Sequence, residues 1–388
     1  MRKIRVLLPA AALLAACNPQ AAAVAQDNAA PAANGLPFQV TPVADFDAPW
    51  AMTFLPDGRL LVTEKVGTLL MVTADGQQRS TVSGIPAVSS AGQGGLMDVV
   101  LHPRFARNKL VYFSFSEANA AGLKGVALAR GKLADTPPCA VAPCHPMLTN
   151  VQVIFRATPY VEGDGHFSGR IAFSPDGKYL FFTNGERQKF DPAQDPKMTL
   201  GKVLRLTPDG KPAPGNPLAA KGFHPAVWSY GHRNLLGIAF DAKGNLWEQE
   251  MGPKGGDEVN LIVPGRNYGY PKVSNGSHYD GRDIPDHAPG DGFEAPKVWW
   301  NPVISPGGLM AYSGKLFPQW QGDLFIGGLS SKSLVRVHVN GTNAAKGDQW
   351  PMGARIREVE QGPDGAIWLL EDGGDGSQGR LLRLTPAG

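Results

Sequence analysis

Short apolar runs alternate with tight turns along most of this chain. In AMTFLPDGRLLVTE, at residues 51–64, two apolar runs flank an Asp-Gly pair, and similar motifs follow at intervals along the chain. Alternation of side chains with a period of two residues is typical of β-strands. Asp-Gly or Lys-Gly between two such runs predicts a hairpin, because Gly adopts a positive φ without steric cost. The pattern therefore predicts an all-β protein built from paired strands.

This strand–turn–strand motif recurs through the sequence. Its copies lie at residues 51–64, 98–115, 170–185, 236–250, 357–372 and, in a more divergent form, 309–329. Six four-stranded units repeated around an axis form a β-propeller, which hides most sheet edges. A β-sandwich is the alternative, but one such domain would need far more strands than usual. We therefore predict a six-bladed β-propeller with four-stranded blades over residues 38–388.

Composition and charge are consistent with this fold and exclude several functions. The 388 residues include 48 Gly and 34 Pro, which suits a β protein with many turns. Arg2, Lys3 and Arg5 account for the whole formal net charge of +3, so no general attraction to nucleic acid is expected from the remainder. The sequence has no GxGxxG after a strand, no P-loop and no GxSxG motif.

The N-terminus predicts an export signal. A basic stretch at residues 1–5 precedes an apolar run at 6–14 that is too short to span a bilayer. The following Leu-Ala-Ala-Cys resembles a bacterial lipobox in which Cys17 is the acylated residue. Residues 1–16 would then be a lipoprotein-type signal peptide.

A second cleavage site leaves the anchoring open. Residues 23–25 form an A-x-A site, and cleavage there would release a soluble protein. Residues 17–37 are rich in Ala, Pro and Asn and predict a flexible tether. We expect a periplasmic protein that reaches a membrane only through its lipid, with the soluble periplasmic form as the alternative.

Two further cysteines lie close together. Cys139 and Cys144 flank a Pro-rich segment, PPCAVAPCHP. Export permits a disulfide, whereas a metal site would need more ligands and has only His145 nearby. We predict a disulfide that closes this small loop, with free thiols or a metal site as alternatives.

One His and one Glu flank the third repeat. His166 precedes its first strand, and His is the natural general base near neutral pH. Glu186 follows its second strand, so the hairpin returns this carboxylate to the same face, where it could orient the imidazole. A structural His bonded to a loop carbonyl is the alternative. Gln93 stands in a Gly-rich run before the second repeat, at the place that His166 has before the third. The glycines would allow a ligand to approach the backbone closely, and a turn is the alternative.

Arginines stand at the starts of two other repeats. Arg233 and Asn234 precede the strand predicted at 235–240, and Arg355 and Arg357 precede the last repeat. The planar fork of Arg suits carboxylate or quinone oxygens, although an isolated Arg can form a surface ion pair instead. Three arginines at equivalent strand starts predict one central anionic ligand.

Oxygen donors follow the strand predicted at 245–249. Gly252 and Pro253 offer backbone carbonyls, and oxygen ligands suit Ca²⁺ better than transition metals. A second cation site could be built from Asp257, Glu258 and the Asn267-Tyr268-Gly269 corner. Ordinary turn chemistry is the alternative for both groups.

The motifs together resemble those of one family. In order they are GQGGLMDVVLHPRF, GHFSGRIAFSPDGKYLFFTNGE, SYGHRNLLGIAF, EMGPKGGDEVN, GRNYGYP and RIREVEQGPDGAIWLLED. From about residue 38 to 385 the chain resembles the soluble quinoprotein sugar dehydrogenases of the glucose/sorbosone dehydrogenase family. The resemblance implies a six-bladed propeller that binds pyrroloquinoline quinone (PQQ) and Ca²⁺ and oxidises aldose sugars at C1 to lactones.

The resemblance also implies roles for individual residues. His166 would take the proton of the sugar C1 hydroxyl while the C1 hydride passes to the quinone. Contacts to the quinone would come from Gln93, Arg233 and Asn234, and contacts to the carboxylates of the cofactor from Arg355 and Arg357. The carbonyls of Gly252 and Pro253 would ligate a Ca²⁺. Glu258 and the Tyr268 carbonyl would hold a structural Ca²⁺.

The chain departs from the family pattern at two positions. The family often has Asp where Glu186 stands, and its cofactor-facing Lys falls near Ser330, with Lys332 two positions on and on the same strand face.

The competing functions are a non-catalytic propeller binding module and a Ca²⁺-dependent lactonase-type hydrolase, but a neutral lactone gives the arginines no role. An unidentified electron acceptor of the quinone or cytochrome type would reoxidise the cofactor.

Overall fold

The computed structural model describes residues 35–135, 145–374 and 376–387. The predicted signal peptide, Cys17, most of the predicted tether and the pair Cys139 and Cys144 lie outside these ranges. Within them, none of the helices is long and apolar enough to cross a membrane.

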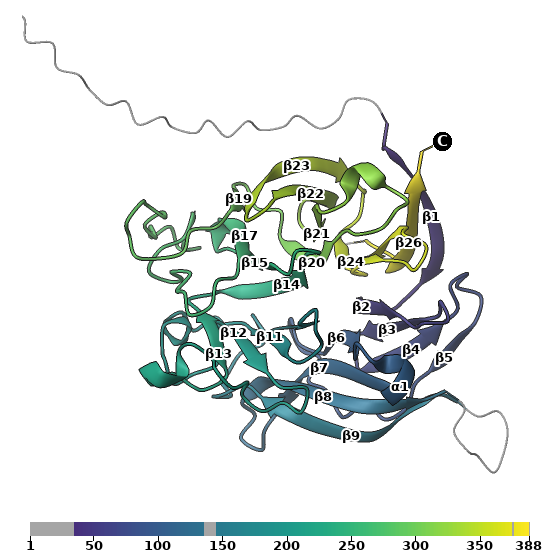
Figure 1. Ribbon diagram of the computed structural model, residues 1–388, viewed down its shortest axis with the longest axis horizontal. Coiled ribbons are helices and arrows are strands. Elements are labelled where there is room, and N and C mark those ends of the chain that lie inside the picture. Colours follow the sequence, from purple (N-terminus) through teal and green to yellow (C-terminus); the bar gives the residue numbers. More distant parts are fainter. Residues whose placement is uncertain (1–34, 136–144, 375, 388) are drawn as a thin grey trace, which may run out of the picture. The chain divides into compact units, whose positions relative to one another are not determined.

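Six four-stranded antiparallel sheets surround a central axis, as the sequence predicts (Figure 1). Blade 1 contains β2 (Pro49–Phe54), β3 (Leu60–Glu64), β4 (Thr68–Val72) and β5 (Arg79–Thr81). Blade 2 contains β6 (Leu96–Leu101), β7 (Leu110–Ala118), β8 (Lys124–Ala134) and β9 (Met147–Arg156). Blade 3 contains β10 (Ser168–Phe173), β11 (Leu180–Asn184), β12 (Lys202–Leu206) and β13 (Val227–Tyr230).

The other three blades follow the same plan. Blade 4 contains β14 (Asn234–Phe240), β15 (Leu246–Met251), β17 (Asp257–Leu261) and β19 (Val298–Trp300). Blade 5 contains β20 (Pro306–Ala311), β21 (Leu324–Gly328), β22 (Ser333–Asn340) and β23 (Asn343–Pro351). Blade 6 contains β24 (Ile356–Gln361), β25 (Ile367–Glu371), β26 (Arg380–Pro386) and β1 (Phe38–Asp45). The remaining elements are β16 (Lys254–Gly255), β18 (Gly276–Ser277), helix α1 (Phe105–Asn108) and 3₁₀ turns at Asp191–Ala193, Ala219–Lys221 and Pro318–Trp320.

Each predicted repeat forms the first two strands of a blade. The first strands β2, β6, β10, β14, β20 and β24 contact one another around the axis. The divergent copy at 309–329 is the β20–β21 hairpin of blade 5. Asp257 and Glu258 lie in strand β17, which excludes the alternative that these two residues belong to an ordinary turn.

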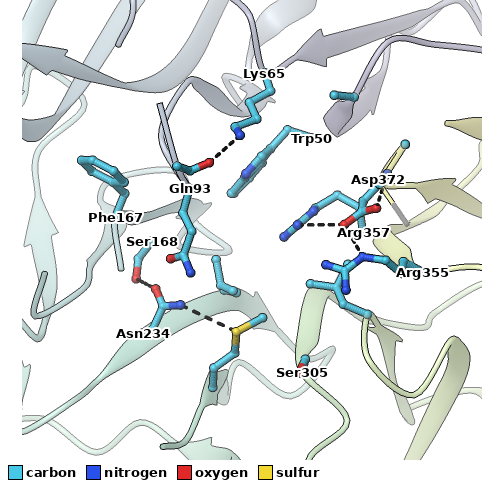
Figure 2. A pocket seen from close by; sticks show the side chains of 17 residues that line it. Trp50, Lys65, Gln93, Phe167, Ser168, Asn234, Ser305, Arg355, Arg357 and Asp372 are labelled. Carbon is cyan, nitrogen blue, oxygen red and sulfur yellow. Dashed lines mark hydrogen bonds and ion pairs between the residues drawn. The ribbon is translucent and has the colours of Figure 1, made fainter. Parts of the chain in front are cut away.

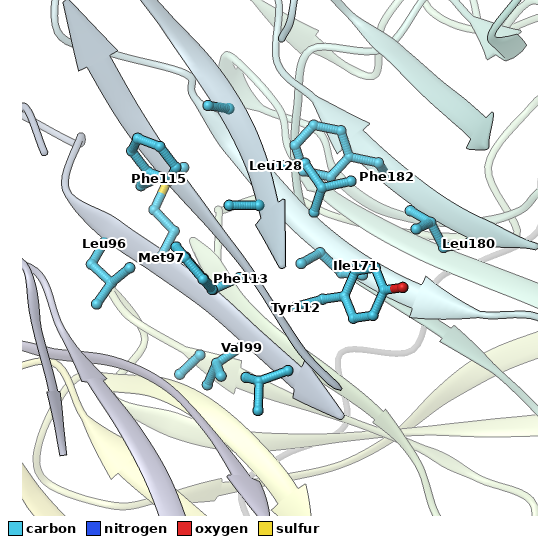
Figure 3. Close-up of a cluster of buried hydrophobic side chains, with 14 of the residues drawn as sticks. Leu96, Met97, Val99, Tyr112, Phe113, Phe115, Leu128, Ile171, Leu180 and Phe182 are labelled. Atoms are coloured by element: carbon cyan, nitrogen blue, oxygen red, sulfur yellow. The ribbon is translucent and has the colours of Figure 1, made fainter. Parts of the chain in front are cut away.

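The hydrophobic core lies between neighbouring blades. Figure 3 shows side chains from β6, β7 and β8 of blade 2 meeting those from β10 and β11 of blade 3, among them Phe113 and Phe182, which are fully buried. Because neighbouring blades cover both faces of these strands, the second strands are continuous apolar runs, such as LFF at the start of β11. The site described below therefore stands on a rigid, fully packed scaffold.

The two ends of the described chain close the ring. Strand β1 pairs with β26 along its whole length, so blade 6 takes its outermost strand from the N-terminal side and its other three from the C-terminal side. Phe38, at the start of β1, is buried, and its ring lies edge-on to Trp350 at 5.4 Å and to Trp320 at 6.3 Å. This contact joins β1 to the core of blade 5.

Replacing Phe38 should test this closure. Phe38→Ala removes a buried ring, and such changes typically cost about 3–5 kcal/mol of the free energy of unfolding. Gln39→Ala, at the exposed neighbouring position, should change it by less than about 0.5 kcal/mol. Chemical denaturation measures both, and equal effects of the two substitutions would contradict the role given to Phe38.

Candidate active site

The ends of the inner strands form a cavity of about 480 Å³ near the axis (Figure 2). All six first strands start at the same end of the propeller, and the second strands return to it. Residues at the starts of first strands, such as Trp50 and Asn234, therefore meet residues just after second strands, such as Lys65 and Asp372. The volume lies within the range of about 300–1,000 Å³ that is usual for small-molecule sites.

Cationic side chains dominate one part of the cavity wall. Arg355 Nε lies 2.8 Å and Arg357 Nη2 lies 3.3 Å from Asp372 Oδ2. Lys65 Nζ donates to the carbonyl of Gly92 at 2.5 Å. Burial lowers the pKa of Arg357 to about 10, so this group stays charged at neutral pH. Three cations against one carboxylate make this cavity suitable for an anionic ligand.

The cationic lysine is not the one that the sequence suggested. Lys332 does not line the cavity, whereas Leu329, three positions earlier, does. Lys65 takes this place because it directly follows β3, at the same point of its repeat as Asp372 in blade 6. Comparing the repeats position by position would have identified Lys65.

Amide side chains and an indole form the rest of the wall. Gln93 Oε1 accepts the backbone N–H of His166 at 2.7 Å, and Ser168 Oγ donates to Asn234 Oδ1 at 3.2 Å. The flat indole of Trp50 also lines the cavity. The structure thus places the predicted residues Gln93 and Asn234 in the same cavity as Arg355 and Arg357.

His166 and Glu186 form a buried pair beside this cavity. His166 Nδ1 lies 2.5 Å from Glu186 Oε1, and the two side chains are 7% and 0% exposed. Glu therefore reaches the imidazole where the family often has Asp. An ionised carboxylate accepts the Nδ1 proton, which leaves Nε2 as the acceptor of the ring. His166 lines two further cavities, of about 230 and 590 Å³.

The electrostatic environment keeps His166 neutral and Glu186 ionised. Burial lowers the pKa of His166 below its ordinary value, although the hydrogen bond to Glu186 partly opposes this shift. Burial alone would raise the pKa of Glu186, but the hydrogen bond and charge of His166 and the N–H of Phe190 lower it overall. A neutral imidazole beside a carboxylate can accept a proton near neutral pH.

Arg233 lies beside the main cavity rather than in its wall. It lines the two cavities that contain His166, and its Nη1 donates to the carbonyls of Met251 at 2.9 Å and Gly252 at 2.5 Å. Its buried Nε has no hydrogen-bond partner among the described residues. Two of the three predicted arginines therefore share one cavity, and the third lines the neighbouring spaces.

The Gly-Pro corner lines the same space. Gly252 and Pro253 line the cavity of about 590 Å³ together with His166. The carbonyl of Gly252 already accepts a hydrogen bond from a guanidinium, which shows that positive charge is favoured at this oxygen. Neutral oxygen donors of this kind fit a hard cation such as Ca²⁺.

A second, smaller space is lined by carboxylates. Its volume of about 10 Å³ suits a single ion or water, and Glu250, Glu258 and Tyr268 line it. Glu250 and Glu258 are partners across β15 and β17, and burial and the charge of Glu250 raise the pKa of Glu258. Asn260 Nδ2 donates to Glu258 Oε1 at 3.1 Å. The predicted residues Glu258 and Tyr268 thus lie in one acidic, ion-sized space.

Other members of this acidic group were not predicted from the sequence. Ligand atoms of His232, Glu248 and Glu250 lie within 4.8 Å of one another, and all three residues are buried. Two glutamates two positions apart in WEQE share one strand face, an unusual pattern for a buried strand that could have been noticed.

Comparison with known proteins identifies the family of this chain. Residues 46–383 match the family model described as "Glucose / Sorbosone dehydrogenase". The chain is 38% identical to aldose sugar dehydrogenase YliI of Escherichia coli (strain K12) over 349 residues, which covers 88% of this chain and 90% of that protein. The chain belongs to the glucose/sorbosone dehydrogenase family.

Solved structures of relatives have the same fold. The apo-form of the soluble aldose sugar dehydrogenase from Escherichia coli is 38% identical, with a TM-score of 0.82 and coverage of 90% of this chain and 100% of that chain. The PQQ-bound form of the aldose sugar dehydrogenase from Streptomyces coelicolor is 32% identical, with a TM-score of 0.74 and coverage of 92% and 99%. The predicted family and enzyme class, a sugar dehydrogenase, are therefore confirmed.

The charge on Glu186 should set the pKa of His166. Glu186→Gln removes the negative charge that favours the imidazolium, so the pKa of His166, already below about 6.5, should fall further. NMR titration of the imidazole resonances measures this shift. Glu117→Gln, which alters a carboxylate bonded to Arg156 and Tyr160 instead, should leave it unchanged. A rise in the pKa of His166 in Glu186→Gln would contradict the pairing.

Proposed function

We propose that this protein oxidises aldose sugars at C1 to lactones, with PQQ and Ca²⁺ as cofactors. The observation that supports it best is the buried His166–Glu186 pair beside a cavity with three cationic side chains. Bound PQQ supplies an electrophilic quinone that accepts a hydride, and Ca²⁺ supplies a Lewis acid that polarises it. The protein supplies binding, orientation and the base.

The main cavity fits PQQ, which is a planar tricarboxylate. Lys65, Arg355 and Arg357 offer positive charge to carboxylates, and Arg forms paired hydrogen bonds with them. Gln93 and Asn234 offer amide groups to the quinone oxygens, and the unpartnered Nε of Arg233 is a further donor beside them. The carboxylates and the quinone oxygens of the ligand would thus each have matching groups in this chain.

His166 would act on the sugar C1 hydroxyl. Its Nε2 accepts the hydroxyl proton as the hydride leaves C1, and the resulting imidazolium is stabilised by the carboxylate of Glu186. The sugar would lie in the cavities that His166 lines outside the main one. Loss of one proton and one hydride converts the cyclic hemiacetal to a lactone.

Two Ca²⁺ sites are part of the proposal. The carbonyls of Gly252 and Pro253 would hold the ion at the quinone, and Glu258 with the Tyr268 carbonyl would hold a structural ion between β15 and β17. The buried carboxylates around the second site repel one another, and a divalent cation would relieve that repulsion. A lactonase-type hydrolase is less favoured because it leaves Lys65, Arg355 and Arg357 without a ligand.

The location and electron acceptor are also proposed from the sequence. The basic and apolar residues 1–14 and the lipobox at Cys17 favour an exported, periplasmic protein anchored by lipid. A quinone or cytochrome in that compartment would accept the electrons.

Reconstitution tests the proposed function directly. Purified mature protein supplied with PQQ and Ca²⁺ should reduce an artificial dye when aldoses are added. His166→Ala should retain PQQ binding, measured by the cofactor absorbance that stays with the protein, and lose about 10²–10⁴-fold in kcat.

The outcomes separate the parts of the proposal. If none of the sugars in a broad aldose panel supports activity, the proposed enzyme reaction is refuted. Full turnover by His166→Ala would refute His166 as the base and leave the reaction itself standing.

Calcium should stabilise the protein through Glu258. Ca²⁺ that binds only the folded state adds about 2.7 kcal/mol when its concentration is 100 times Kd, so EGTA should lower the Tm of the cofactor-free protein. Glu258→Gln removes one proposed ligand and should reduce the difference in Tm between the protein with Ca²⁺ and the protein with EGTA. Glu162→Gln changes an exposed residue outside the site and should leave that difference unchanged. An unchanged response to EGTA in Glu258→Gln would exclude the site.

A further inference from the structure

The proposed reaction gives Arg187 no role, although this residue is a buried cation that directly follows Glu186. Arg187 is 1% exposed, and burial lowers its pKa to about 10, so the guanidinium stays charged at neutral pH. Each of its three nitrogens donates to a backbone carbonyl: Nε to Gly165 at 2.8 Å, Nη1 to Lys124 at 2.8 Å and Nη2 to Gly163 at 2.5 Å. The whole planar fork is therefore used to hold backbone.

Arg187 contacts the chain on both sides of His166. The carbonyl of Gly165 belongs to the residue before the proposed base, and the ring of Phe167 belongs to the residue after it. The centre of this ring lies 3.7 Å from Cζ of the guanidinium. A guanidinium over an aromatic face is attracted to it, most strongly where water is excluded. Phe167 also lines the main cavity (Figure 2). One side chain thus fixes the backbone before His166 and the side chain after it.

The backbone around His166 has a conformation that needs such support. His166, Ser168 and Arg187 have φ values of 50°, 61° and 63°, a region that residues other than glycine rarely adopt. Strain of this kind persists only where the surroundings enforce it, and it is concentrated at functional sites. The two segments also approach closely, since a Cβ atom at Gly165 would lie 2.5 Å from the side chain of Gln188.

The pair Glu186 and Arg187 connects His166 to the neighbouring blades. The carboxylate of Glu186 bonds to Nδ1 of the imidazole, while its backbone N–H donates to the carbonyl of Arg233 at 2.9 Å, directly before the first strand of blade 4. Arg187 reaches in the other direction, to the carbonyl of Lys124 at the start of β8 in blade 2. The imidazole and its backbone are therefore held from both sides by two consecutive residues.

We propose that Arg187 is a positioning residue for the base, which fixes the backbone on both sides of His166 while Glu186 fixes the ring. The inference rests on the proposed function and deepens it. Arg187 lines neither of the two cavities outside the main one that contain His166, so it would act through His166 and not on the sugar. A displacement of about 1 Å in a catalytic group can cost about 10²-fold in rate, so a residue behind the base can control turnover.

The charge of Arg187 gives a second readout at the imidazole. Arg187 and Arg233 lower the pKa of His166, whereas Glu186 raises it. Arg187→Met removes one of the two cations and should therefore raise the pKa of His166 toward its ordinary value of about 6.5. The other acidic and basic side chains that line these two cavities stay in place in this variant, namely Lys254, Asp257, His278, Asp280 and Arg282.

Two substitutions separate the charge from the grip on the backbone. Arg187→Lys keeps the charge and loses the planar fork, so the PQQ- and Ca²⁺-reconstituted variant should lose about 10²-fold in kcat and retain PQQ binding and the pKa of His166. Arg187→Met should lose a similar factor in kcat and also show the raised pKa in an NMR titration of the imidazole. In Arg187→Ala, guanidinium ion at a non-denaturing concentration should restore part of kcat.

Arg205 provides the matched control in the same blade. Its guanidinium carbon lies 4.2 Å from the centre of the Trp228 ring, and its Nη2 donates to the carbonyl of Pro214 at 2.7 Å. The surroundings therefore resemble those of Arg187, but Arg205 lines neither cavity that contains His166. Arg205→Met should change neither kcat nor the pKa of His166.

NMR titration of the cofactor-free protein separates this inference from the proposed reaction. If no sugar is oxidised, but the pKa of His166 rises in Arg187→Met and not in Arg205→Met, the reaction is refuted and the positioning role is supported. If the wild-type protein oxidises sugars and both Arg187→Lys and Arg187→Met keep full kcat, the reaction stands and the inference is overturned. A lowered Tm together with lost PQQ binding in both variants would show a general structural role and would also overturn it.

Discussion

The antiparallel pairing of β1 with β26 is the contact on which the propeller depends. Without it, blade 6 would end in an unpaired edge, and blades 1 and 6 would be held together only by packing, such as that of β2 against β24 and β25. Phe38 reinforces the pairing by packing its ring edge-on against Trp320 and Trp350. Ring closure is a long-range interaction, because it joins residues near the two ends of the described chain.

Closure also creates the site. The six inner strands start at one end of the propeller, so residues far apart in sequence meet there, such as Lys65 from blade 1 and Arg357 from blade 6. Each strand end contributes one or two polar groups, and none of the blades forms the cavity alone. The packed blades hold these groups in fixed positions, as a preorganised site requires.

Glu186 connects the chemistry with the shape of the site. Its carboxylate lies at the centre of a buried network in which His166 and the backbone of the following segment are both donors. The negative charge supports the imidazolium that proton transfer would produce, and the same carboxylate accepts the backbone N–H of Phe190. The orientation of the His166 ring and the backbone of the segment that ends at Phe190 are therefore coupled through one side chain.

The sequence by itself determined the strands, the hairpins, the number of blades and several site residues, because these follow from local alternation, turn residues and motif order. His166 and Glu186 were predicted since they flank one hairpin, whose geometry is local. Lys65 and the glutamates beside Glu258 were missed. Their positions depend on which strand ends and loops the closed ring brings together, and a period of two residues contains no information about that long-range packing.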